Sequence, residues 1–144
     1  MLDLIIKNGK CYIDGQLKNQ DIGIKDGLIQ NIGEISDEAK EILNAEGQTV
    51  LPGCIDTQTH FREPGSTDTE DLHSGSRAAI AGGITGVFEM PNTNPPTSTK
   101  LEFQKKLDLA KNRMYCNYAF YFGATADNAN ELADLENLEG CCGI

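Results

Sequence analysis

The 144-residue sequence has no long apolar run. No stretch reaches the roughly 18 consecutive apolar residues that a membrane-spanning helix needs. The opening residues, MLDLIIKNGK, contain only a short apolar patch with no basic segment before it, so no signal peptide is expected. These absences predict a soluble, cytoplasmic protein with no membrane partner.

Positive charge and cysteine pairs are also scarce. Twelve Lys and Arg residues against 22 Asp and Glu give a net charge of −10, without the basic surface that a nucleic-acid partner requires. The five cysteines are odd in number and none has C-x-x-C spacing. Adjacent Cys141 and Cys142 would point to opposite faces of a strand, which argues against a zinc-thiolate site. Free thiols in a reducing compartment are expected, in a protein that handles small molecules.

The first 50 residues are typical of short strands joined by tight turns. Asp-Gly or Glu-Gly dipeptides interrupt the apolar runs at 14–15, 26–27 and 46–47. An Asp-Gly between two apolar runs is a strong hairpin signal. Residues 1–50 are therefore predicted to form a small antiparallel β subdomain, with a last strand pair around residues 46–47.

From Leu51 onward the pattern alternates between strands and helices. Strands are expected at 54–61, 84–90, 115–125 and 141–144, and helices at 66–83, 98–114 and 127–140. Thr67 with Glu70 predicts a capping box for the first helix, and Gly82-Gly83 predicts its end. Such alternation implies parallel strands with right-handed crossovers.

Two α/β architectures fit this alternation, the (β/α)8 TIM barrel and the open doubly wound sheet. No G-x-G-x-x-G or P-loop follows the first strand, and polar residues stand at strand ends, which favours the barrel. A complete barrel needs roughly 250 residues. Residues 51–144 are therefore expected to hold about three βα units, truncated at strand 4 of an N-terminal fragment.

The stretch IDTQTHFREPG at residues 55–65 concentrates chemistry. Asp56, Gln58, His60 and Arg62 alternate, and a continuous strand would aim all four at one face. Donors two residues apart lie roughly 6.6–6.8 Å apart along a strand, close enough to share a metal centre. A lone histidine at a strand end is more often an ordinary hydrogen-bonded residue than a metal ligand. The interpretation of His60 as a metal ligand therefore depends on the polar residues beside it in the sequence.

Two further polar groups lie near the expected strand ends. The guanidinium of Arg62 suits a substrate carboxylate. Asn92 follows the second strand and offers both a donor and an acceptor to an amide-like substrate. The alternatives are an Asn-rich turn at Asn92 and, for Arg62, an ion pair with a neighbouring acid, namely Glu63, Asp68 or Glu70.

The sequence resembles the dihydroorotases of the cyclic amidohydrolase family over essentially its whole length. The segments that carry this resemblance are LPGCIDTQTHFREPG, EDLHSGSRAAIAGGITGVFEMPNTNPPT and the leader LIIKNGKCYIDG with DIGIKDGLIQNIG. Hydantoinases, dihydropyrimidinases and allantoinases share the leader and first strand but fit REPG and MPNTNP less well.

The resemblance implies a metal-dependent hydrolase (β/α)8 barrel, preceded by a β-sandwich-type subdomain built from both chain ends. It implies reversible hydrolysis of dihydroorotate to N-carbamoyl-L-aspartate in pyrimidine biosynthesis, with one or two zinc ions. His60 then corresponds to the second histidine of an H-x-H metal pair, Arg62 to the substrate-carboxylate clamp and Asn92 to a substrate-binding loop amide. The general base and the bridging lysine are expected beyond Ile144, so residues 1–144 alone are expected to be inactive.

Gln58 departs from the family pattern, because most relatives have the first histidine of the pair there. A neutral amide oxygen is a poorer zinc ligand than imidazole. The site then binds one metal through other residues, or Gln58 ligates weakly, or the protein is a non-catalytic scaffold, for example for aspartate transcarbamoylase. A related allantoinase or hydantoinase is the other alternative. Homo-oligomer formation is a further expectation.

Overall fold

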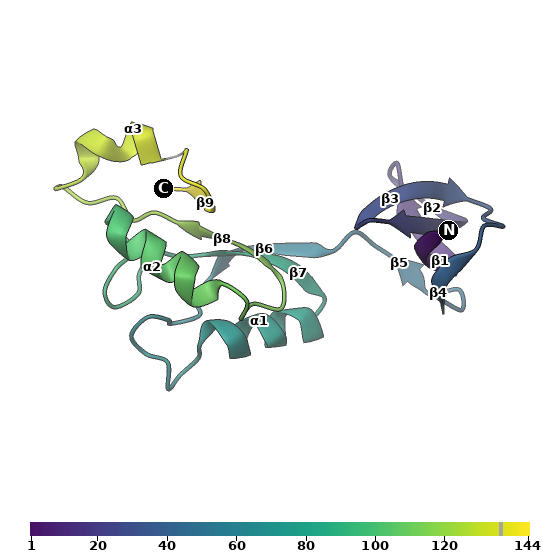
Figure 1. Cartoon of the computed structure of the whole chain (residues 1–144), viewed down its shortest axis with the longest axis horizontal. Helices are drawn as coiled ribbons and strands as arrows, with labels where there is room; N and C mark the ends of the chain where they lie inside the picture. Colours follow the sequence, from purple (N-terminus) through teal and green to yellow (C-terminus); the bar gives the residue numbers. More distant parts are fainter. Residues whose placement is uncertain (136) are drawn as a thin grey trace. The chain divides into compact units, whose positions relative to one another are not determined.

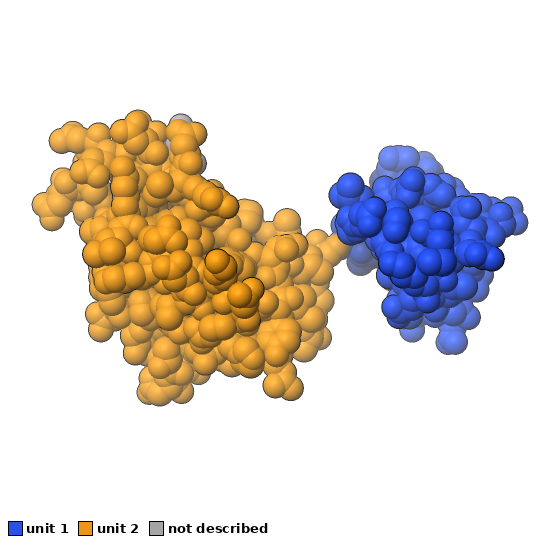
Figure 2. Space-filling model, in the orientation of Figure 1, with its two compact units in different colours: residues 1–52 blue, residues 53–144 orange. Residues whose placement is uncertain are grey.

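The computed structural model describes residues 1–135 and 137–144, and the chain divides into two units between Pro52 and Gly53 (Figures 1 and 2). Each unit has its own sheet and its own buried core. None of the helices in the described residues is long and apolar enough to cross a membrane.

Unit 1 (Met1–Pro52) is a five-stranded sheet. Its strands are β1 (Leu2–Ile13), β2 (Gln16–Lys25), β3 (Leu28–Gly33), β4 (Ala39–Asn44) and β5 (Thr49–Val50). The β1–β2 and β2–β3 pairs are antiparallel hairpins, as predicted. Both turns need positive φ at two successive residues, and Asp14-Gly15 and Asp26-Gly27 supply it.

The predicted strand pair around residues 46–47 is wrong. β4 and β5 do not pair with each other, because each pairs in parallel with β1. The backbone of the turn between β4 and β5 also bonds to β1. The Ala45 N–H donates to the Lys7 carbonyl at 2.8 Å, and the Gly47 N–H donates to the Asn8 carbonyl at 2.8 Å. The unit is therefore a mixed sheet, not a wholly antiparallel one.

Unit 2 (Gly53–Ile144) is a parallel sheet with the order β6-β7-β8-β9. The strands are β6 (Cys54–Thr59), β7 (Ile84–Glu89), β8 (Asn117–Tyr121) and β9 (Cys141–Gly143). They alternate with helices α1 (Leu72–Ala81) and α2 (Lys100–Ala110) and with the short η1 (Ala129–Glu131) and α3 (Leu132–Leu135). The predicted βα alternation is confirmed. Consecutive strands stay adjacent and the order never reverses, as in a barrel and unlike a doubly wound sheet.

The first helix begins later than predicted. The Ser74 N–H donates to Asp71 Oδ1 at 2.6 Å, and the Asp71 N–H donates back to Ser74 Oγ at 3.1 Å. Asp71 is thus the N-cap of α1, and the predicted Thr67–Glu70 capping box is wrong. The predicted end is confirmed, with Gly82 as the C-cap.

The third helix is much shorter than the predicted 127–140. Asn128 is buried and its side chain bonds to loop backbone: Oδ1 accepts from the Thr125 N–H at 2.8 Å, and Nδ2 donates to the Ser98 and Gly123 carbonyls at 2.9 Å each. These bonds favour a turn over a helix start. Residue 136, within the predicted helix, lies outside the described residues.

Candidate active site

The loops that follow β6, β7 and β8 are tied to one another at the carboxyl ends of the strands. The Asn94 N–H donates to the Pro64 carbonyl at 3.0 Å, joining the REPG loop to the MPNTNP loop. The Gly123 N–H donates to the Thr97 carbonyl at 2.7 Å, joining that loop to the next. The two sequence signatures thus form one connected edge, where barrel enzymes place their active sites.

His60 stands directly after β6, half-buried, and its ring is held by the neighbouring loop. Nδ1 lies 2.9 Å from Oδ1 of Asn92. Because an amide oxygen only accepts, this bond places the proton on Nδ1 and leaves the lone pair on Nε2. That is the arrangement of a metal-binding imidazole whose outer nitrogen is fixed by a hydrogen bond. The structure therefore brings His60 and Asn92 together.

The regular alternation predicted for Asp56, Gln58 and His60 is broken in the structure. In the pairing of β6 with β7, Asp56 lies opposite Val87 and Thr59 lies opposite Glu89. The three-residue step in β6 thus matches a two-residue step in β7, so β6 contains one extra residue here. Such an irregularity breaks the alternation of a strand. The predicted common face of all four polar residues is therefore wrong. Asp56 Oδ1 instead accepts the Gln58 backbone N–H at 3.0 Å.

Gln58 lines a cavity of about 400 Å³ at the carboxyl ends of the strands. The wall of this cavity is mostly apolar, with a few polar groups. Its lining residues come from all four parallel strands or the segments after them, including Gln58, Met90, Tyr121 and Ile144. The Tyr121 hydroxyl donates to the Thr57 carbonyl at 3.2 Å and so fixes one side of the cavity.

Arg62 lies beyond the end of β6, with φ of 60°, and this left-handed turn takes it out of the strand alternation. Its side chain is exposed, and within the described residues it makes no ion pair. The neighbouring Glu63 has the structural role instead. Its carboxylate accepts two hydrogen bonds from Arg113, at 2.8 and 3.1 Å, and one from the Leu72 N–H at 2.9 Å. The hydrogen bonds to Glu63 raise the pKa of the Arg113 guanidinium above its ordinary value.

Sequence reasoning missed a buried ion pair between Glu89, at the end of β7, and Lys106 of α2. A signal existed, because Lys106 falls on the same helical face as the buried Phe103 and Ala110. Glu89 likewise ends a strand that has no other charged residue. Desolvation raises the pKa of Glu89 and lowers that of Lys106, and the attraction between them opposes both shifts.

The metal predicted from the resemblance finds only part of a ligand set. The described residues contain no group of three or more His, Cys, Asp and Glu side chains placed to hold an ion. His60 Nε2 fits as one imidazole ligand, and the amide oxygen of Gln58, two residues earlier, is a weaker kind of ligand. A zinc site uses three or four protein ligands, so these two do not complete one.

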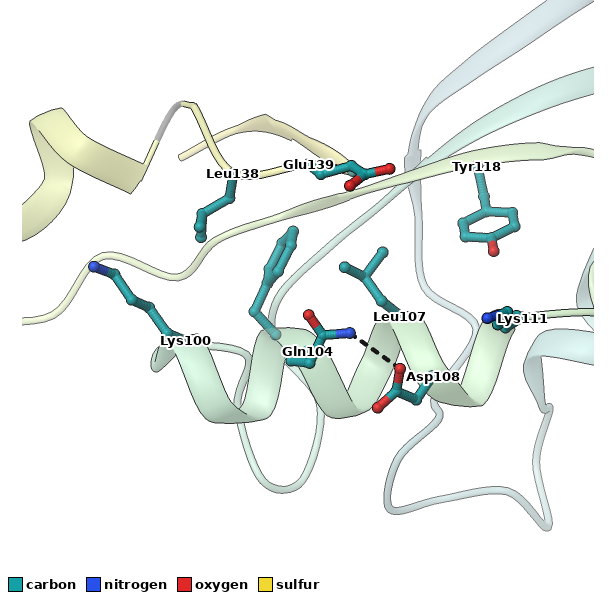
Figure 3. Close-up of a pocket in the computed structure, with 10 residues that line it drawn as sticks. Lys100, Gln104, Leu107, Asp108, Lys111, Tyr118, Leu138 and Glu139 are labelled. Atoms are coloured by element: carbon teal, nitrogen blue, oxygen red, sulfur yellow. Dashed lines mark hydrogen bonds between the residues drawn. The ribbon is translucent and has the colours of Figure 1, made fainter.

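A larger cavity, of about 790 Å³, lies between α2 and residues 138–140 (Figure 3). Its polar wall includes Gln104, whose Nε2 donates to Asp108 Oδ1 at 3.0 Å, and its apolar wall includes Leu107 and Leu138. None of the four predicted site residues lines it. The chemistry indicated by the sequence therefore belongs to the carboxyl edge of the sheet.

Comparison with known proteins identifies the family. The amidohydrolase family profile matches residues 49–140. Allantoinase from Escherichia coli O1:K1 / APEC is 38% identical over 137 residues, which cover 94% of this chain and 30% of that relative. The chain thus spans about a third of the length of the curated relatives it matches.

Solved structures agree. L-hydantoinase (dihydropyrimidinase) from Arthrobacter aurescens superposes with a TM-score of 0.91 at 32% identity, over 99% of this chain and 32% of that one. D-hydantoinase (dihydropyrimidinase) from Thermus sp. gives a TM-score of 0.74 at 26% identity, over 92% of this chain and 30% of the other. The α/β fold is therefore that of a metal-dependent hydrolase barrel, and the chain belongs to the amidohydrolase family.

Proposed function

We propose that the full-length protein carrying these residues is a metal-dependent hydrolase of cyclic amides, acting on a ureide ring of the allantoin or hydantoin type. The names of the relatives support this class over dihydroorotase, which the sequence motifs had favoured. The observation that carries the proposal is the hydrogen bond from His60 to Asn92 at the carboxyl edge of the sheet, which leaves the lone pair of the imidazole on Nε2.

In this proposal His60 is a metal ligand, and Gln58 lies beside it as a weak ligand or as a hydrogen-bonding partner of the ring. A bound zinc ion would polarise the scissile carbonyl and lower the pKa of its water. Asn92 holds His60 in the ligating tautomer. The cavity lined by Gln58 and Tyr121 receives the ring, whose amide groups match the donor and acceptor of the glutamine.

Dihydroorotase is the second candidate, because Arg62 favours a substrate that bears a carboxylate. The guanidinium is exposed beyond β6 and makes no ion pair with the part of the chain that is described. A free guanidinium at the edge of a site suits bidentate carboxylate binding. Dihydroorotate has such a group, whereas allantoin and hydantoin do not.

The test is a substrate panel on the full-length protein, with its metal content measured in parallel. Allantoin, hydantoin, dihydrouracil and dihydroorotate are assayed at equal concentration. Turnover of allantoin or hydantoin without dihydroorotate supports the proposal, and the reverse supports the second candidate. A metal-free, inactive preparation that binds aspartate transcarbamoylase would refute both and indicate a scaffold.

A further inference from the structure

The buried pair of Glu89 and Lys106 lies beneath the loop that carries Asn92. Glu89 is 0% exposed and Lys106 is 1% exposed. The two residues come from different elements, the end of β7 and the middle of α2, and their side chains form an ion pair. Neither residue lines the cavity at the strand ends.

Stability alone is a weak reason for such a pair. Removing two charges from water costs several kcal/mol for each ion, and apolar side chains of similar volume are often equally or more stabilising. The surroundings are otherwise apolar, with Lys106 Nζ 5.1 Å from the centre of the Phe120 ring and Phe103 buried one turn away. A role in fixing the local geometry of the chain therefore explains this buried pair better than stability does.

The contacts of Lys106 run toward the site. Besides pairing with Glu89, Nζ donates to the Met90 carbonyl at 3.1 Å. The Met90 N–H donates to the Thr59 carbonyl at 2.9 Å, so this residue also joins the end of β6. Two residues beyond Met90, Asn92 bonds to His60.

We propose that Glu89 and Lys106 are positioning residues that clamp the Met90-Pro91-Asn92 segment to α2 and thereby hold His60 in its Nδ1–H tautomer. The inference rests on the proposed function only where it concerns metal binding. The hydrogen-bond geometry of His60 is a property of the chain itself.

The experiment is Lys106→Met in the full-length protein, which removes the Nζ donor and keeps an unbranched apolar stem. The first readout is the His60 tautomer in metal-free, ¹⁵N-histidine-labelled protein at neutral pH, with His60→Ala used to assign the signal. We expect the native protein to show Nδ1–H and Lys106→Met to shift toward Nε2–H, the form that free imidazole side chains favour. The second readout is zinc affinity, expected to fall by about 10–100-fold, the range typical of partners that orient a ligand.

Two further variants keep the test decisive. Lys105→Met is the matched control, because Lys105 is exposed on the same helix and its one ion pair among the described residues is with Glu102, so it should change neither readout. Glu89→Gln with Lys106→Met removes both charges, which avoids an unpaired buried carboxylate if the single variant fails to fold, and should give the same tautomer shift.

An unchanged His60 tautomer in the double variant would overturn the inference and leave the pair a packing feature. A protein that hydrolyses no cyclic amide yet shows the tautomer shift would refute the proposed function and leave this inference standing. The two failures are therefore distinguishable.

Discussion

At the scale of single residues, the proposed metal site has one imidazole and one amide, where the family resemblance implies a pair of imidazoles. His60 is fixed by Asn92, and Gln58 lines the cavity beside it. Of these two residues, Gln58 is the weaker zinc ligand, because it offers a neutral amide oxygen where a histidine would offer a ring nitrogen.

Gln58→His should raise the zinc affinity of the full-length protein, because it adds an imidazole nitrogen two residues from His60. Metal analysis after equilibrium dialysis measures this change, and an unchanged zinc affinity would contradict it.

His60→Ala should reduce both metal affinity and activity. The loss of metal affinity should exceed the factor of about 10–100 that is typical when a residue orienting a metal ligand is removed. Metal analysis after equilibrium dialysis measures the metal affinity. Full zinc stoichiometry in His60→Ala would show that this residue is no ligand.

Arg62→Gly tests the carboxylate clamp and suits the backbone, because φ at this residue is 60°. If Arg62 binds a substrate carboxylate, KM for dihydroorotate should rise by the equivalent of about 2–5 kcal/mol, while KM for hydantoin changes little. Arg62→Lys is the control that keeps the charge and loses the bidentate geometry. Equal KM values for all substrates across the three proteins would mean that Arg62 takes no part in binding.

At the scale of elements, the hairpin turns and the order of strands and helices were predicted correctly, whereas the start of the first helix, the length of the third helix and the long-range strand pairing were not. The Asp-Gly hairpins and the βα alternation follow from turn chemistry and periodicity within a few residues, and both are confirmed. The parallel pairing of β4 and β5 with β1 depends on residues far away in sequence, which no local pattern encodes. The same holds for the extra residue that β6 has between Asp56 and Thr59.

The start of α1 shows how two equivalent local signals compete. Thr67 and Asp71 are both good caps, each with a polar residue three positions on, and the sequence does not rank them. Glu63 decides between them, because its carboxylate is held by Arg113 and accepts the Leu72 N–H, a free donor in the first turn. A contact between residues 50 positions apart therefore sets the helix boundary.

Asp71→Ala should lower the melting temperature of the full-length protein, and Thr67→Ala should leave it nearly unchanged. The Ser74 backbone N–H lowers the pKa of Asp71, since it stabilises the charged carboxylate. This contribution is fully present above the ordinary aspartate pKa of about 3.9 and is lost as pH falls through the lower pKa of the folded state. Thermal melts at neutral pH and in this acidic range measure it. A larger loss in Thr67→Ala would contradict the assignment of Asp71 as the cap.

At the scale of the whole molecule, each unit leaves much apolar surface in water. In unit 1, Leu28 is 72% exposed, Ile29 is 62% exposed and Ile42 is 58% exposed. In unit 2, Ile55 on β6 is 58% exposed and Ile144 after β9 is 49% exposed. β6 and β9 also form the two edges of the parallel sheet, and unpaired edges next to apolar surface favour association.

Residues 1–144 expressed alone should therefore be poorly soluble or lack fixed tertiary packing. The units bury small cores of their own, so secondary structure should persist while the exposed sheet surfaces bind a hydrophobic dye. Far-UV and near-UV circular dichroism, dye fluorescence and calorimetry measure this, with the full-length protein as the control. A sharp calorimetric transition with native near-UV signal and no dye binding would contradict the prediction. It would mean that the two cores outweigh the conformational entropy of the chain without further strands to cover these surfaces.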